Sequence, residues 1–418
     1  MKRCLVLFTA LSLLLLIVLP ACGGDEGEKT PTASPTITAI PTTTPTSTVG
    51  PTATPTVTAT ATATPTTSEP VKIGAINSWS GAAAISGLSL ADPVIKLVEK
   101  QVKDQGGILG GREVKVIRYD NRASVAEAQA GVKKLYYDDK VSAITIGGVS
   151  GAEFNAVAAA CEELNILYAA LAHVEDLVKY KFTVNGSVQR EVSRGIGNKF
   201  INEVLKPRTA AFFGTDDAQA HSNMEGTKEA IEAAGTKTVY IGYCPIDTTD
   251  FSPYLTKIKY EKPDVLYLYS GSNEVHISIA KQIMELGGWG DIKVFTQPSG
   301  ESAKKQPGAQ GWYMYLYWSP ELDYPGAAKF VNDYQAMHGR APSANQVIYY
   351  NSLWTAVYAM ELAGTDTDRV AIAQAARSGK LEWDTPMGRA HFMPDGTSGL
   401  GVVMEQVVDG AMVLIPMP

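Results

Sequence analysis

The chain is poor in the side chains that most often bind metals or act as nucleophiles. Its 418 residues include four cysteines and five histidines, and no two cysteines have the C-x-x-C spacing of a zinc site. We therefore expect no metal and no other cofactor. The sequence also lacks a G-x-S-x-G elbow, an H-E-x-x-H pair and a Walker loop. These absences disfavour a hydrolase, although a Ser-His-Asp set can assemble from distant positions.

Positive charge is in deficit as well. Lysine and arginine number 36 against 43 aspartate and glutamate residues, which gives a formal net charge of -7. Nucleic-acid binding favours a basic face, so we expect no nucleic-acid partner.

The sequence also lacks a long apolar run at its N-terminus. The run over residues 5–19 is shorter than the about 20 residues needed to span a bilayer.

The N-terminal residues have the order of an export signal. A basic head precedes the apolar run, and a small residue then stands directly before Cys22. The cysteine at this cut point resembles the lipobox of bacterial lipoproteins, in which the thiol receives a lipid. A plain signal peptide with a chance cysteine and an uncleaved anchor remain alternatives. We expect a signal peptide with a lipobox over residues 1–22, and a mature protein held outside the cytoplasm, lipid-anchored to the cell membrane at Cys22.

Residues 23–69 have the composition of a disordered tether. From residue 28 they are almost wholly threonine, proline, alanine and serine, with too few large apolar side chains to offset the entropy of ordering. Proline favours an extended spacer, and the same composition is compatible with O-glycosylation. The folded body then runs from Pro70 to the end, about 350 residues, which is enough for two lobes.

Strand-like and helix-like patterns alternate along this body. Short connections between them predict α/β lobes with parallel sheets, covered by helices on both faces. Two runs of strands favour two doubly wound lobes over a single TIM barrel. The expected strands are 71–76, 114–119, 143–146, 166–170, 210–213, 239–243, 265–269 and 292–295. The expected helices are 89–105, 125–137, 152–164, 191–205, 224–234, 254–260 and 277–286.

The segment Gly-Gly-Ile-Leu-Gly-Gly, residues 106–111, invites comparison with a phosphate-binding loop. Such a loop follows a strand and opens a helix, whereas this one closes a predicted helix and leads into a strand. We predict a helix C-terminus and turn, where glycine tolerates positive φ. The two cysteines of the body, Cys161 and Cys244, fall in different predicted lobes and are expected to be isolated buried thiols.

The body contains a colinear set of short motifs: VKIGAI (71–76), QGGILGGR (105–112), YDN (119–121), GGVSG (147–151), DFS (250–252), GRAP (339–342), FMPDG (392–396) and VVDG (407–410). As a set, they resemble motifs of periplasmic binding proteins for branched-chain amino acids. The resemblance covers essentially the whole body. It implies a type I periplasmic-binding fold, in which two lobes joined by three hinge crossings close on a small ligand and deliver it to an ABC permease. It further implies that lobe one comprises residues 70–182 and 299–379, and lobe two residues 183–298 and 380–418.

The ligand site is expected where parallel strands end, because open α/β sheets bind ligands outside the carboxyl ends of their strands. The segment after the first strand contains Trp79 and Ser80, and the one after the third contains Ser150 and Gly151. Trp79 either stacks on a ligand or packs under the hinge. Ser150 either contacts a ligand carboxylate beside the helix N-terminus or only caps that helix.

Three further candidates follow from the resemblance. His173 stands where the family has a threonine, and it either lines the cleft or fills a loop. Gln219 lies near the place of a family tyrosine. Glu274 lies near the family's ammonium-binding carboxylate, although it can equally stabilise the first turn of its own helix.

These departures from the family pattern argue against a leucine-like ligand. We expect a small polar ligand, an amino acid first and an amide or carboxylic acid next. The expected protein is not an enzyme but a monomeric solute-binding component of an ABC importer. A sensor that docks a membrane receptor and a hydrolase that uses the cleft are the alternatives.

Overall fold

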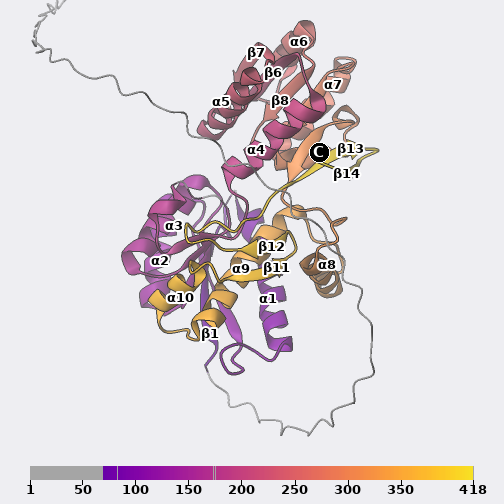
Figure 1. Cartoon of the computed structure of the whole chain (residues 1–418). Coiled ribbons are helices and arrows are strands. Elements are labelled where there is room, and N and C mark those ends of the chain that lie inside the picture. Colours follow the sequence, from indigo (N-terminus) through magenta and orange to yellow (C-terminus); the bar gives the residue numbers. More distant parts are fainter. Residues whose placement is uncertain (1–68, 82, 173, 175, 418) are drawn as a thin grey trace, which may run out of the picture. The chain divides into compact units, whose positions relative to one another are not determined.

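The computed structural model describes residues 69–81, 83–172, 174 and 176–417, and two large sheets organise them (Figure 1). The predicted signal peptide, almost all of the predicted tether, Cys22 and His173 lie outside the described residues.

The first sheet has five parallel strands in the order β2-β1-β3-β4-β5. They are β1 (Val71–Asn77), β2 (Val114–Asp120), β3 (Ala143–Ile146), β4 (Tyr168–Ala170) and β5 (Thr183–Asn185). Every residue of β3, β4 and β5 is buried, as expected for a parallel sheet with both faces covered. The helices of this lobe are α1 (Asp92–Asp104), α2 (Val125–Tyr137), α3 (Gly151–Leu164), α8 (Pro325–His338), α9 (Ala344–Ala363) and α10 (Arg369–Ala376).

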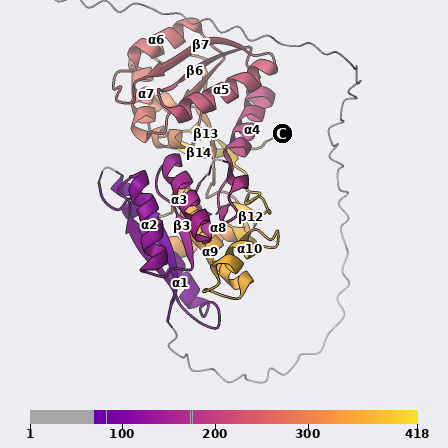
Figure 2. The ribbon, with the colours of Figure 1, turned by 90° about the vertical axis from the view of Figure 1, so that its left-hand side faces the viewer.

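These helices form two groups. Helix α2 packs against α3, whereas α9 packs against α1 and α10 (Figures 1 and 2). The small hairpin of β11 (Glu382–Thr385) and β12 (Gly388–His391) contacts α8.

The second sheet has seven strands in the order β14-β13-β10-β9-β8-β6-β7. The parallel strands are β6 (Thr209–Thr215), β7 (Lys237–Cys244), β8 (Val265–Tyr269), β9 (Lys293–Thr296) and β10 (Tyr313–Leu316). The hairpin of β13 (Val403–Val408) and β14 (Ala411–Ile415) adds to β10 in antiparallel orientation. The helices of this lobe are α4 (Arg190–Phe200), α5 (Ala218–Ala233), α6 (Ser252–Glu261) and α7 (Asn273–Glu285).

The two sheets share one connectivity. The order β2-β1-β3-β4-β5 recurs as β7-β6-β8-β9-β10, which is a common order of doubly wound folds. The predicted fold class, two doubly wound α/β lobes, is therefore confirmed. In each sheet the chain adds strands first toward one edge and then toward the other, and the order reverses between β1 and β3 and between β6 and β8. Such folds bind ligands at this point.

Sheet membership corrects the lobe boundaries expected from the sequence. Strand β5 belongs to the first sheet and β10 to the second, while the β11–β12 hairpin contacts lobe-one helix α8. Lobe one thus comprises residues 69–185 and 325–391, and lobe two residues 190–316 and 403–417. The three crossings are residues 186–189, 317–324 and 392–402. The alternation of elements along a sequence does not say which sheet a short strand joins, and this is why the predicted boundaries were wrong.

Each lobe has its own apolar core. One cluster of buried side chains combines lobe one with Val188, Trp318 and Phe392 of the crossings. Two further clusters lie in lobe two, one around Phe213 and the other around Phe212. Cys161 and Cys244 are buried free thiols.

Many predicted elements are confirmed. Helix α2 and strands β3 and β8 have the expected bounds. The predicted helix 89–105 is α1, which follows a π-helical turn over Ser86–Ala91. The predicted glycine turn is confirmed by φ values of 82° at Gly107 and 89° at Gly110.

Candidate functional site

A cavity of about 140 Å³ is lined by both lobes and by the crossings that join them. Lobe one contributes Gly151, Phe154, Ala172 and Ile348, and the first crossing contributes Ser187 and Val188. Lobe two contributes Arg190, Ser193, Gln219, Asn223, Tyr269, Gln297 and Tyr315, and the second crossing contributes Tyr317. Most of these residues follow or end a parallel strand, or begin the next helix. The cavity thus lies at the strand ends where doubly wound sheets bind ligands.

The lobe-one wall depends on two glycines after β3. Gly147 and Gly148 have φ values of 104° and 120°, a region that disfavours other residues. A Cβ atom on Gly147 would lie 1.8 Å from the Tyr168 hydroxyl, and one on Gly148 would lie 2.8 Å from the Glu153 side chain. Only glycine lets this loop turn tightly enough to start α3 at Gly151.

Glu153 holds the same loop in place from within. Its carboxylate is buried and accepts hydrogen bonds from the Asn121 amide, from Val149 N at 3.2 Å and from Ser150 Oγ at 2.7 Å. Ser150 Oγ also caps α3 by accepting from the Glu153 backbone N–H. The structure therefore shows Ser150 as a helix cap, and its contact with a ligand stays a prediction.

Two predicted site residues are engaged elsewhere in lobe one. Trp79 Nε1 donates to Asp92 Oδ1 at 2.8 Å, and its ring packs against the lobe-one core. Ser80 Oγ donates to Asp120 Oδ2 at 2.5 Å. Neither is among the described residues that line the cavity.

In lobe two, Gln219 lines the cavity and Glu274 does not. Gln219 lies in the first turn of α5, which Asp217 caps, and its Nε2 lies 3.6 Å from the place of a Cβ on Gly151. Glu274 is exposed, and its carboxylate accepts a hydrogen bond from Ser272 Oγ at 2.9 Å. Gly151 and Gln219 thus bring the two walls of the cavity close together.

The sequence reasoning did not identify Arg190, the only charged residue among those described that line the cavity. Arg190 begins α4 directly after the first crossing. Among the described residues, no carboxylate forms an ion pair with its guanidinium. A cation at a helix N-terminus opposes the helix dipole, so this charge does not stabilise α4.

Three tyrosines line the same cavity, two of them close to this cation, and they too were missed. Burial raises the pKa of Tyr269 and of Tyr317, and in both cases the Arg190 guanidinium opposes the rise. Burial also raises the pKa of Tyr315, whose hydroxyl is hydrogen-bonded with Ser193. All three phenols are therefore protonated at neutral pH and can donate hydrogen bonds. The available signal was their position at strand ends. Tyr269 is the last residue of β8, Tyr315 the penultimate residue of β10, and Tyr317 the first residue after β10.

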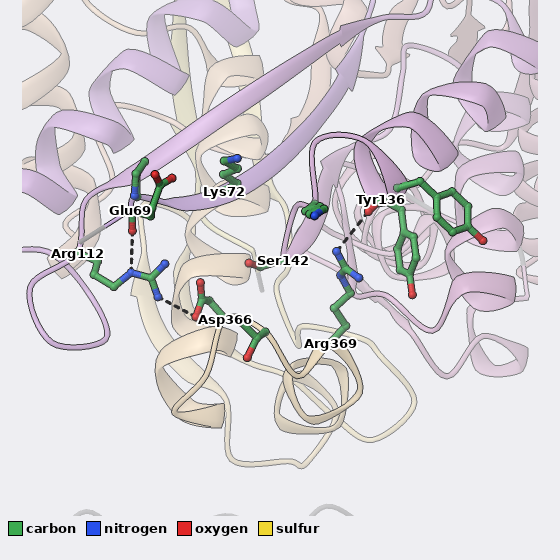
Figure 3. Close-up of a pocket in the computed structure, with 11 residues that line it drawn as sticks. Glu69, Lys72, Arg112, Tyr136, Ser142, Asp366 and Arg369 are labelled. Carbon is green, nitrogen blue, oxygen red and sulfur yellow. Dashed lines mark hydrogen bonds and ion pairs between the residues drawn. The ribbon is translucent and has the colours of Figure 1, made fainter. Parts of the chain in front are cut away.

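A larger cavity of about 470 Å³ lies at the opposite edge of the lobe-one sheet, where β1 begins (Figure 3). Its arginines are already used by the fold. Arg112 donates to the Glu69 carbonyl at 2.8 Å and pairs with Asp366 at 2.8 Å. Arg369 donates to the carbonyls of Val141 and Tyr136. This cavity lies at the amino ends of the strands, so we do not consider it the ligand site.

The described residues contain no group of three or more His, Cys, Asp or Glu side chains arranged to hold a metal ion. Within the same part of the chain, no helix is both long enough and apolar enough to cross a bilayer.

The comparisons with known proteins agree with this architecture. Residues 70–411 match the model of the periplasmic binding protein family. The chain is 22% identical over 306 residues to Leu/Ile/Val-binding protein homolog 4 of Brucella abortus, covering 66% of this chain and 69% of that protein. A branched-chain amino acid substrate-binding protein from Streptococcus pneumoniae, solved with isoleucine, superposes with a TM-score of 0.71 at 21% identity, over 83% of this chain and 99% of that one. A solute-binding protein of an R. palustris ABC transporter, solved with benzoate, gives a TM-score of 0.70 at 18% identity, over 83% and 96%.

Proposed function

Because the chain belongs to the periplasmic binding protein family, we propose that it captures a small organic solute for an ABC importer. The observation that carries this proposal is the cavity lined jointly by the two lobes and the crossings. Closure of two rigid lobes around a solute is a common way to exclude water from such a site. The cavity volume of about 140 Å³ equals the volume that about five water molecules occupy in liquid water, and this size suits a small solute.

Binding, rather than chemistry, suits the residues present. Among the described residues that line the cavity there is no histidine, cysteine or carboxylate, the groups that most often act as general bases or nucleophiles. The two solved structures named above contain isoleucine and benzoate. Amino acids and small carboxylic acids are therefore the first solutes to test, and each should emerge unchanged.

The remaining parts of the proposal concern location and partners. We propose that the protein acts outside the cytoplasm as a monomer, held to the membrane by a lipid on Cys22, and that it delivers its solute to a membrane permease. The export-signal order of the N-terminus and the lipobox-like cysteine support this.

Closure can be tested by trapping it. Gly151 and Gln219 lie on opposite walls, with the Gln219 amide 3.6 Å from a Cβ built on Gly151. In a Gly151→Cys, Gln219→Cys double variant, a solute that closes the lobes should speed formation of the inter-lobe disulfide. The two single variants are the controls. A panel of amino acids, amides, carboxylic acids and sugars should contain compounds that raise both the cross-linking rate and the melting temperature. A panel without effect on either measurement, or a solute converted to product, would contradict solute capture.

A further inference from the structure

Among the described residues that line it, the cavity between the lobes has one cation and no anion. Arg190 is the only charged residue among the fourteen described residues that line it. The other polar groups are hydroxyls and amides, of Ser187, Ser193, Gln219, Asn223 and Gln297, besides the three tyrosines. A solute placed here therefore meets one fixed positive charge, and the described walls offer no negative charge in return.

The electrostatic surroundings of Arg190 favour an anion. Its guanidinium lies close enough to Tyr269 and Tyr317 to influence both phenols, and guanidinium presents several N–H donors in a geometry that fits a carboxylate. The amino end of α4, where Arg190 stands, adds partial positive charge. Charge and hydrogen-bond donors thus converge on the same side of the cavity.

The described residues that line the cavity include no carboxylate that could pair with the ammonium group of an amino acid. The predicted ammonium-binding residue, Glu274, is exposed and bonded to Ser272, and it does not line the cavity. Burying a second cation beside Arg190 without a carboxylate is unfavourable, because neither charge is compensated. The amide oxygens of Gln219 and Asn223 can accept hydrogen bonds, but they supply no charge.

The remaining wall is apolar and largely aromatic. Phe154, Val188 and Ile348 face the cavity together with the rings of the tyrosines. Tyr315 and Tyr317 meet edge to face, with ring centroids 6.5 Å apart. Aromatic walls favour flat apolar groups through offset or edge-to-face contacts. A compact ring suits both this wall and the volume of about 140 Å³.

We propose, as a refinement that rests on the proposed solute capture, that the site selects a small monocarboxylate with an apolar, ring-sized body and no α-ammonium group. The carboxylate pairs with Arg190 and accepts hydrogen bonds from the surrounding tyrosine hydroxyls. The body of the ligand packs against Phe154, Val188 and Ile348.

Two matched pairs of compounds test this by titration calorimetry on the full-length protein in detergent. Benzoate and benzamide differ in the charge of the carboxyl group, and 4-methylpentanoate and leucine differ in the α-ammonium group. We expect benzoate to bind at least tenfold more tightly than benzamide, and 4-methylpentanoate at least tenfold more tightly than leucine. Equal or tighter binding of leucine overturns the refinement and leaves solute capture intact. Failure of all four compounds to bind also overturns it, while capture itself is then judged by the cross-linking panel.

Variants of α4 give an independent readout. Arg190→Gln should weaken benzoate binding at least tenfold and change benzamide binding little, which also shows that the variant is folded. Arg190→Lys should retain part of the benzoate affinity because it keeps the charge. Arg194→Gln is the matched control, since it removes the same charge from the same helix outside the cavity. Unchanged benzoate binding in Arg190→Gln, or an equal loss in Arg194→Gln, contradicts the assignment.

Discussion

A single buried histidine fixes the edge of lobe two beside the cavity. His276 Nδ1 lies 2.9 Å from the Ser272 carbonyl oxygen and Nε2 lies 2.9 Å from Thr296 Oγ1. A carbonyl can only accept, so Nδ1 carries the proton and Nε2 accepts from the threonine. The side chain thereby joins the start of α7 to the end of β9. Gln297 makes a similar connection, because its amide donates to the Ser270 carbonyl.

This arrangement predicts a loss of stability in mild acid. Burial lowers the pKa of His276 from 6.5 to about 4, so the unfolded chain binds a proton more readily than the folded one. The free energy of unfolding should therefore fall as pH drops from 6.5 to 4, by up to about 3 kcal/mol. His276→Gln should lose this component, and urea unfolding at each pH measures it. The exposed His391→Gln is the control, and an unchanged pH dependence in His276→Gln would contradict the prediction.

Several residue roles were out of reach of sequence reasoning. Trp79 and Ser80 follow a strand at the expected edge, yet their polar atoms bond to Asp92 and Asp120. Arg190 carries no sequence signal, since one arginine at a helix start resembles any surface cation. Its significance comes from the tyrosines that the fold places around it. Gly151 and Gln219 do line the cavity, and their contact with a solute remains a prediction.

Among the elements, α9 illustrates why the C-terminal half of the sequence was harder to interpret. Fourteen of its 20 residues are buried, on all sides of the helix. A helix that is apolar all round lacks the amphipathic period from which helices are predicted. Helices α2 and α3 were easier to predict, because Ser124 and Ser150 cap them and give a clear start signal.

Strand β13 carries a second buried titratable side chain, Glu405, next to the second crossing. Glu405 is buried, its Oε1 has no hydrogen-bond partner among the described residues, and Ser319 of the crossing bonds to its carboxyl group. Burial raises the pKa of Glu405 from 4.5 to about 7, with Glu301 and Glu321 acting in the same direction and Lys304 against it. The folded protein therefore holds this proton more tightly than the unfolded chain does.

The stability linked to Glu405 should fall as pH rises from 4.5 to 7, by up to about 3 kcal/mol. This slope is opposite to that of His276, so the two partly offset each other in the wild type. Glu405→Gln should be more stable than the wild type at pH 8 and nearly equal to it at pH 4.5, as measured by urea unfolding. The exposed Glu285→Gln should show neither effect. A Glu405→Gln variant that is less stable at pH 8 would exclude the raised pKa.

For the molecule as a whole, the separation of the cores is the main mechanical feature. The lobe-one cluster and the two lobe-two clusters share no buried residue among those described. Two bodies with separate cores can move relative to each other without disrupting either, and three short crossings are suited to take up the change. This is the property that solute capture by closure requires.

The attachment of the whole protein to the membrane is tested at its N-terminus. If Cys22 carries the lipid, Cys22→Ser should move the protein from the membrane fraction to the soluble fraction of the exporting cell. The apolar run of residues 5–19 is short for a span, so it should not retain the variant. Adding Ser12→Cys to the Cys22→Ser variant is not expected to restore attachment, since residue 12 lies inside that apolar run. Retention of Cys22→Ser in membranes would instead indicate an uncleaved anchor.

The sequence by itself determined the lobe type and the edge of each sheet at which to look for a site. Hydrophobic periodicity, helix caps and turn glycines act over a few residues, so they can be recognised without the fold. Only the tertiary structure decided which sheet β5 and β10 join, and which side chains share a cavity. Arg190, Tyr269 and Tyr317 come from a helix start, a strand end and a crossing. Their chemistry as a group exists only because two lobes and their crossings bring them within reach of one another.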